Sequence, residues 1–88
     1  MNDQQPTVVD VRTPEEFSEG HVVGSVNIPL NEIPERIEEL RGLPTPLILC
    51  CRSGARSDSA MRYLQQMGLP DVSNGGSWQE VQETLKNR

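Results

Sequence analysis

The feature that most constrains the fold is the run Pro46–Cys50, which is apolar on both faces of an extended chain. A strand with alternating polar residues can leave one face in water, but this segment must be covered on both faces. Such a strand suits the centre of a parallel sheet with helices on each side. The longest apolar run, residues 47–51, is far shorter than the roughly 20 residues of a membrane span, so we expect no membrane association.

Short apolar segments alternate with helical patterns along the rest of the chain. The patterns predict strands at 7–11, 26–28, 46–50 and 71–73, and helices that begin near 13, 31, 57 and 77. Thr13 with Glu16, and Ser77 with Glu80, have the spacing of helix capping boxes, and residues 74–76 are predicted to form a turn. The alternation predicts an α/β domain with a central, mostly parallel sheet of four to five short strands and helices on both faces, in three layers.

Length and charge narrow the functional classes. The 88 residues support one domain, which we expect to span residues 1–88 and to be monomeric. The formal net charge of −5 argues against a nucleic-acid or anionic-membrane partner. The first residues have neither the basic nor the apolar segment of a secretory leader. We therefore expect a cytoplasmic protein, with a periplasmic location as the alternative if a leader has been removed.

The segment Cys51–Arg56 is the candidate reactive loop. Ligands of parallel α/β sheets bind beyond the carboxyl ends of the strands, and this segment directly follows the central strand and precedes a helix. Successive amides in such a loop, the helix amino terminus and the side chains of Arg52 and Arg56 would all favour a thiolate and a bound anion. Gly54 would allow the backbone turn that the loop needs. The pattern predicts a nucleophilic cysteine.

Two cysteines compete for this role. Cys51 to Arg56 makes a six-residue loop, narrow enough to hold one extra sulfur atom on the cysteine, whereas Cys50 to Arg56 makes a seven-residue loop, wide enough for phosphate or arsenate. We favour Cys51, because it stands first after the predicted strand and Gly54 lies three residues beyond it; we assign Cys50 to the core. A phosphatase or arsenate reductase that uses Cys50 is the alternative. A disulfide between adjacent cysteines would be strained, and one histidine without a Cys-x-x-Cys pair makes a metal site improbable.

Four segments together resemble the rhodanese domain, most closely small single-domain sulfurtransferases of the phage-shock-protein E type. They are residues 10–17 (DVRTPEEF), 20–29 (GHVVGSVNIP), 51–57 (CRSGARS) and 75–78 (GGSW). Val23 and Ser25 depart from the residues that are common in the family. The resemblance implies a parallel-sheet α/β fold and a thiosulfate sulfurtransferase that works through a cysteine persulfide.

Carried onto this sequence, the resemblance assigns a role to each matching position. Cys51 would be catalytic, and the sulfur-binding residues would be Arg52, Ser53, Gly54, Ala55 and Arg56. Asp10, Arg12 and Ser57 would support the loop without taking part in the chemistry. The partners would be a small anionic sulfur donor and a thiol or cyanide acceptor, and neither a metal nor an organic cofactor is implied. A non-catalytic rhodanese-like regulatory module is a further alternative.

Overall fold

The computed structural model describes residues 6–86 and contains a four-stranded sheet in that range. Every strand pair in the sheet is parallel, and the spatial order is β2-β1-β3-β4. The strands are β1 (Thr7–Asp10), β2 (Val26–Asn27), β3 (Leu47–Cys51) and β4 (Val72–Ser77). The predicted α/β fold with a parallel sheet of four to five short strands is therefore confirmed.

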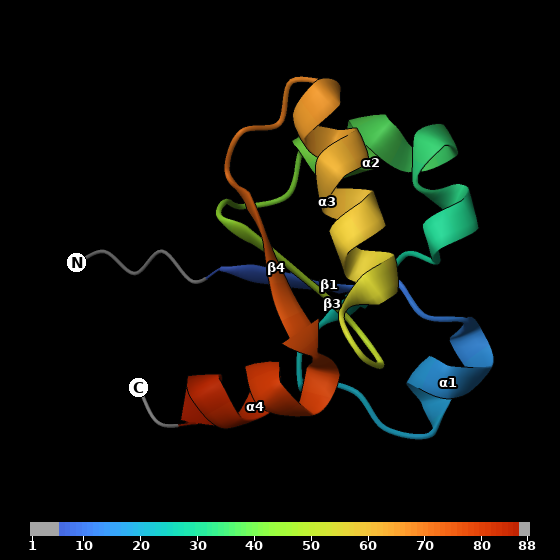
Figure 1. The fold of residues 1–88 in the computed structure, drawn as a ribbon, viewed down its shortest axis with the longest axis vertical. Coiled ribbons are helices and arrows are strands. Elements are labelled where there is room, and N and C mark those ends of the chain that lie inside the picture. Colours follow the sequence, from blue (N-terminus) through green and yellow to red (C-terminus); the bar gives the residue numbers. More distant parts are fainter. Residues whose placement is uncertain (1–5, 87–88) are drawn as a thin grey trace.

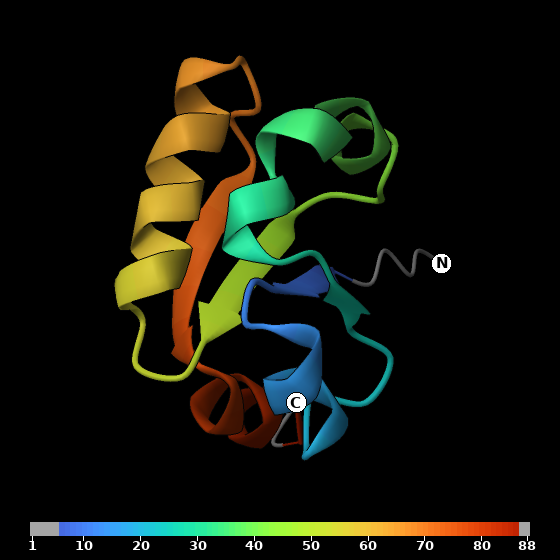
Figure 2. The same cartoon turned by 90° about the vertical axis from the view of Figure 1, so that its right-hand side faces the viewer.

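Helices cover both faces of the sheet, as Figures 1 and 2 show. The α-helices are α1 (Pro14–Ser18), α2 (Ile37–Arg41), α3 (Ala55–Gln66) and α4 (Trp78–Lys86). Leu40 of α2 and Leu64 of α3 pack into one apolar cluster, whereas Val81 of α4 packs into a second. Helices α2 and α3 thus lie on one face and α4 on the other, which gives three layers. Within residues 6–86, no helix combines the length and apolarity needed to cross a bilayer.

The central strand β3 contributes to both clusters, as its two-sided apolarity predicts. Leu47, Leu49 and Cys51 belong to the cluster beneath α2 and α3. Ile48 and Cys50 pack with the cluster beneath α4. Side chains alternate across a strand, so the two neighbouring cysteines point into different layers of the molecule.

The helix predicted to begin near residue 31 is more broken than its apolar spacing indicates. Two 3₁₀ turns, Leu30–Glu32 and Pro34–Arg36, precede the short helix α2. Pro34 lacks an amide proton and its ring crowds the preceding turn, so it opens a new turn here and does not continue a helix from residue 31.

The boundaries around β3 and β4 also differ from the prediction. Strand β3 extends to Cys51, α3 begins at Ala55 and not at Ser57, and β4 continues through the predicted turn at residues 74–76. Strand β4 bulges there, because Leu49 pairs with Asn74 and Cys50 pairs with Gly76. A Cβ on the bulged Gly75 would lie 2.6 Å from Val81 Cγ2. The glycine therefore permits α4 to pack closely on the sheet.

Candidate active site

The loop after β3 lies where the carboxyl ends of β1, β3 and β4 meet, at the same end of the molecule as α1 and α4 (Figure 2). Cys51 is the last residue of β3 and is 1% exposed. Its Sγ accepts a hydrogen bond from the Gly54 amide at 3.0 Å. Gly54 adopts a φ of +101°, a conformation that L side chains rarely take. This turn brings the chain back over the sulfur and starts α3.

Polar groups around Cys51 favour its ionised form. Burial by itself raises the pKa of the Cys51 thiol, but hydrogen bonds from the Ser57 hydroxyl and amide, and from the amides of Gly54 and Ser53, lower it further than burial raises it. The net result is a pKa below the ordinary cysteine value. A buried thiol with converging amides matches the conditions for a nucleophilic thiolate.

Cys50 has the opposite environment. It is fully buried beside Val8, Val22 and Val81 in the layer beneath α4. Burial, together with the neighbouring Asp10 carboxylate, raises the pKa of Cys50 to about 12. A neutral thiol that points away from the loop cannot act as its nucleophile, so this geometry does not favour the phosphatase-type alternative.

The two arginines of the loop have different surroundings. Arg56 pairs with Glu16 of α1 through two hydrogen bonds of 2.8 and 3.1 Å. Glu16 also accepts from the Thr13 amide in the predicted capping box, and the bond from Arg56 is the main cause that lowers the pKa of Glu16 to about 2. Arg56 thus joins the start of α3 to α1, whereas Arg52 is exposed.

A shallow cleft of about 260 Å³ opens beside the loop. Arg52 lines it on the loop side, Glu16 and Glu19 on the α1 side, and Trp78 and Gln79 at the start of α4. Its lining carries both signs of charge next to an aromatic ring. A small polar molecule in this cleft would meet the reactive loop at Arg52.

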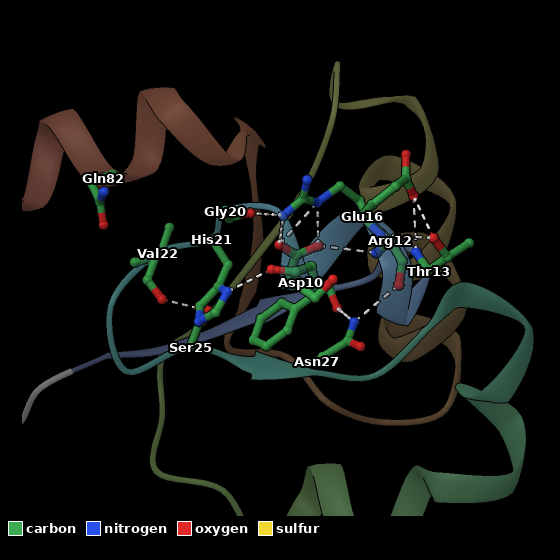
Figure 3. A network of polar contacts seen from close by, with 12 residues as sticks. Asp10, Arg12, Thr13, Glu16, Gly20, His21, Val22, Ser25, Asn27 and Gln82 are labelled. Atoms are coloured by element: carbon green, nitrogen blue, oxygen red, sulfur yellow. Dashed lines mark hydrogen bonds and ion pairs between the residues drawn. The ribbon is translucent and has the colours of Figure 1, made fainter.

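Asp10 and Arg12 form a buried ion pair beside this cleft (Figure 3). The Arg12 guanidinium donates to Asp10 Oδ2 at 2.7 Å and to the Gly20 carbonyl at 2.7 Å, and it lies 5.2 Å from the Trp78 ring centre. The Asn27 side chain donates to the backbone carbonyls of both Asp10 and Arg12. The pair ties the end of β1 to the segment after α1; that it supports the reactive loop stays a prediction.

The structure brings most of the predicted site residues together. The sulfur of Cys51 is surrounded by Ser53, Gly54 and Ser57. Ala55 begins α3 and is exposed. The pattern analysis missed Asn74, whose side chain contacts the loop. Asn74 Oδ1 accepts from Ser57 Oγ at 2.6 Å, and Nδ2 donates to the Gly54 carbonyl at 3.0 Å. Asn-Gly-Gly is typical of a turn, so the sequence predicted a turn here and not a strand residue that contacts the loop.

The sequence matches known proteins along most of its length. The family model of the rhodanese-like domain matches residues 1–84. Thiosulfate sulfurtransferase PspE of Escherichia coli is 35% identical over 74 residues, which cover 83% of this chain and 71% of that protein. The uncharacterized protein YqhL of Bacillus subtilis is 37% identical over 67 residues, or 76% of this chain, and the match spans only about half (52%) of YqhL.

Solved structures have the same architecture. A rhodanese with anions from Escherichia coli superposes with a TM-score of 0.78 at 34% identity. The superposition covers 86% of this chain and 91% of that one. The similarity therefore extends over nearly the whole of that protein.

Proposed function

This chain belongs to the rhodanese-like domain family, and we propose that it is a sulfurtransferase that carries a sulfane sulfur on Cys51. The observation that best supports this function is the position of Cys51 Sγ, which is buried and lies 3.0 Å from the Gly54 amide. The amides of Ser53 and Ser57 also favour the thiolate. A ring of amide donors of this kind stabilises negative charge on sulfur without the need for a metal.

In the proposed first step, the Cys51 thiolate attacks the outer sulfur of thiosulfate or a related donor. A new S–S bond forms at Cys51, the donor's own S–S bond breaks, and sulfite leaves with the electron pair. The negative charge then lies on the outer sulfur of the persulfide. The amides that favour the thiolate would also favour this anion, because it forms in the same loop.

In the proposed second step, a thiolate or cyanide attacks the outer sulfur of the persulfide. The bond between the two sulfurs breaks and its electron pair returns to Cys51, which regenerates the thiolate. The product is a new persulfide or thiocyanate. The name of PspE supports thiosulfate as a donor.

The two arginines would contribute differently to the reaction. Arg52, exposed beside the cleft, would attract the anionic donor from solution. Arg56 would hold the loop against α1 through Glu16. The acidic residues Glu16 and Glu19 also line the cleft, and their charge would assist the departure of sulfite.

Intact-mass measurement after incubation with thiosulfate tests the proposal. The protein should gain the mass of one sulfur atom and lose it on addition of cyanide. Cys51→Ala should abolish the gain, and the matched variant Cys50→Ala should retain it. If the gain is absent in the wild-type protein, the non-catalytic module becomes the better interpretation. If it is retained in Cys51→Ala, Cys51 is not the sulfur carrier.

A further inference from the structure

The side chain of Asn74 has a fixed orientation at the edge of the reactive loop. Its Oδ1 accepts from the Gly76 amide at 3.0 Å, and its Nδ2 donates to the Gly54 carbonyl at 3.0 Å. A backbone amide only donates and a carbonyl only accepts. Exchanging the oxygen and nitrogen of the side chain would break both bonds, so the assignment is unambiguous. The bulge in β4 creates this arrangement, because it directs Asn74 and Gly76 toward each other and toward the loop.

This orientation determines where the Ser57 proton points. Ser57 is fully buried, and its Oγ lies 2.6 Å from Asn74 Oδ1 and 3.5 Å from Cys51 Sγ. A hydroxyl has one proton to donate. The Gly54 carbonyl is a second acceptor, at 3.2 Å from Oγ. Since Asn74 Oδ1 cannot donate, the shorter contact of 2.6 Å requires Ser57 to donate to Asn74 Oδ1. The lone pairs of Oγ then face the sulfur, and Ser57 can only accept a hydrogen bond from the Cys51 thiol.

Ionisation of Cys51 reverses this arrangement. A thiolate is an acceptor, so the Ser57 hydroxyl can stabilise it only by turning away from Asn74 Oδ1. The thiolate therefore gains one hydrogen bond while the Asn74–Ser57 bond is lost. Once Cys51 carries an outer sulfur, the charge leaves Sγ and the hydroxyl is free to return to Asn74.

We propose that Asn74 is a positioning residue that competes with the Cys51 sulfur for the Ser57 hydroxyl and so keeps the thiolate less stabilised than the loop would otherwise make it. The proposal rests on the proposed role of Cys51 as sulfur carrier. Each less stabilised thiolate is a stronger nucleophile toward a sulfur donor, while a smaller fraction of Cys51 is ionised at a given pH. The same competition favours the persulfide over the free thiolate.

The other charged groups near Cys51 do not depend on this contact. Arg56 of α3 interacts electrostatically with the Cys51 thiolate, and it is held by Glu16. Cys50 remains a neutral thiol, and the Asp10–Arg12 pair at the end of β1 lies on its side of the sheet. Substitutions at Asn74 leave these groups in place, so a change in the Cys51 pKa in the Asn74 variants reports on the Ser57 hydroxyl.

Titration of Cys51 by the ultraviolet absorbance of its thiolate tests the proposal without any sulfur transfer. Asn74→Ala and Asn74→Asp both lose the contact between Asn74 Nδ2 and the Gly54 carbonyl, but only Asn74→Ala loses the short acceptor at 2.6 Å from Ser57 Oγ. The Gly54 carbonyl, 3.2 Å from Ser57 Oγ, is then the remaining neutral acceptor, and it competes less well with the thiolate. We expect the Cys51 pKa to fall by about half a unit to one unit in Asn74→Ala and to rise in Asn74→Asp. If Asn74 merely braces the loop, the pKa should rise in both variants, because displaced amides stabilise the thiolate less.

The same substitutions in a Ser57→Ala background provide the control. There the decrease caused by Asn74→Ala should disappear, since no hydroxyl remains to be redirected. Cys51→Ser should remove the Cys51 transition and leave that of Cys50, whose pKa is about 12. A decrease that persists without the Ser57 hydroxyl, or a wild-type-background pKa that does not fall, would overturn the proposal. Because thiosulfate takes no part in this titration, a protein that fails to accept sulfur can still confirm or refute the role of Asn74.

Discussion

Cys50 and Cys51 are neighbours in the chain, but they lie in opposite layers of the molecule. Cys50 faces α4 among valine side chains, beside the buried Asp10–Arg12 pair. Cys51 faces α3 among backbone amides, near the more exposed Glu16–Arg56 pair. The exposed fractions are 0% for Cys50 and 1% for Cys51, so solvent exposure alone does not distinguish a reactive thiol from an inert one. The difference lies in the polar groups that replace water around each sulfur.

The different surroundings of Cys50 and Cys51 should have their largest effect on the rates at which the two thiols are alkylated. With a pKa of about 12, only about one Cys50 thiol in 10⁵ is ionised at pH 7, whereas the Cys51 pKa is below its ordinary value. Iodoacetamide at neutral pH should therefore label Cys51 and leave Cys50 unmodified, as peptide mapping would detect. Labelling in denaturant is the control and should modify both. Equal labelling of the native protein would contradict the contrast between the two layers.

The buried ion pair of the Cys50 layer should give the largest loss of stability. Asp10 is fully buried and its partner Arg12 is 5% exposed, so Asp10→Asn leaves an uncompensated guanidinium. Breaking such a pair costs about 3–5 kcal/mol, which for a domain of this size lowers the Tm by more than about 10 °C. Thermal unfolding followed by circular dichroism measures this.

A double variant distinguishes two causes of this loss of stability: the missing attraction between Asp10 and Arg12, and the unpaired charge left on Arg12. In Asp10→Asn/Arg12→Gln neither charge remains, so the protein should be more stable than Asp10→Asn alone. In the single variant, Arg12 is no longer balanced and should lower the Cys50 pKa, which would make Cys50 easier to alkylate. Equal stability of the single and double variants would mean that the unpaired guanidinium is not the cause of the loss.

The sequence predicted the sheet and the loop well because both depend on local patterns. The apolar run before Cys51 predicts a buried central strand, and Gly54 predicts the backbone turn that follows it. The role of Asn74 could not be predicted, because its contact with Ser57 joins two segments that are 17 residues apart. It also depends on the bulge in β4, which lies where Gly75 packs closely against α4. Likewise, the capping box predicted the position of Glu16 but not its bond to Arg56, 40 residues away.

Breaking the Glu16–Arg56 ion pair, near Cys51, should cause the smallest loss of stability. The dependence of this loss on pH shows whether the ion pair causes it. The side chains of Glu16 and Arg56 are 28% and 34% exposed, so water screens the pair and Glu16→Gln should cost only about 1 kcal/mol at pH 7. Arg56 first, and then the hydrogen bonds from Thr13, lower the pKa of Glu16 from 4.5 to about 2. The unfolded chain therefore binds a proton on Glu16 at higher pH than the folded protein does.

This sign places the stabilising contribution of Glu16 above about pH 4.5 and removes it as the pH falls toward 2. Urea unfolding at several pH values should find the wild-type protein more stable than Glu16→Gln at neutral pH and the difference vanishing near pH 2. The matched control is Glu15→Gln, which removes the same charge from an exposed position in the same turn of α1. If both variants lose equal stability at all pH values, the helix charge and not the bond to Arg56 is responsible. The exposed pair would then contribute nothing to holding the reactive loop, and the amides alone would set the environment of Cys51.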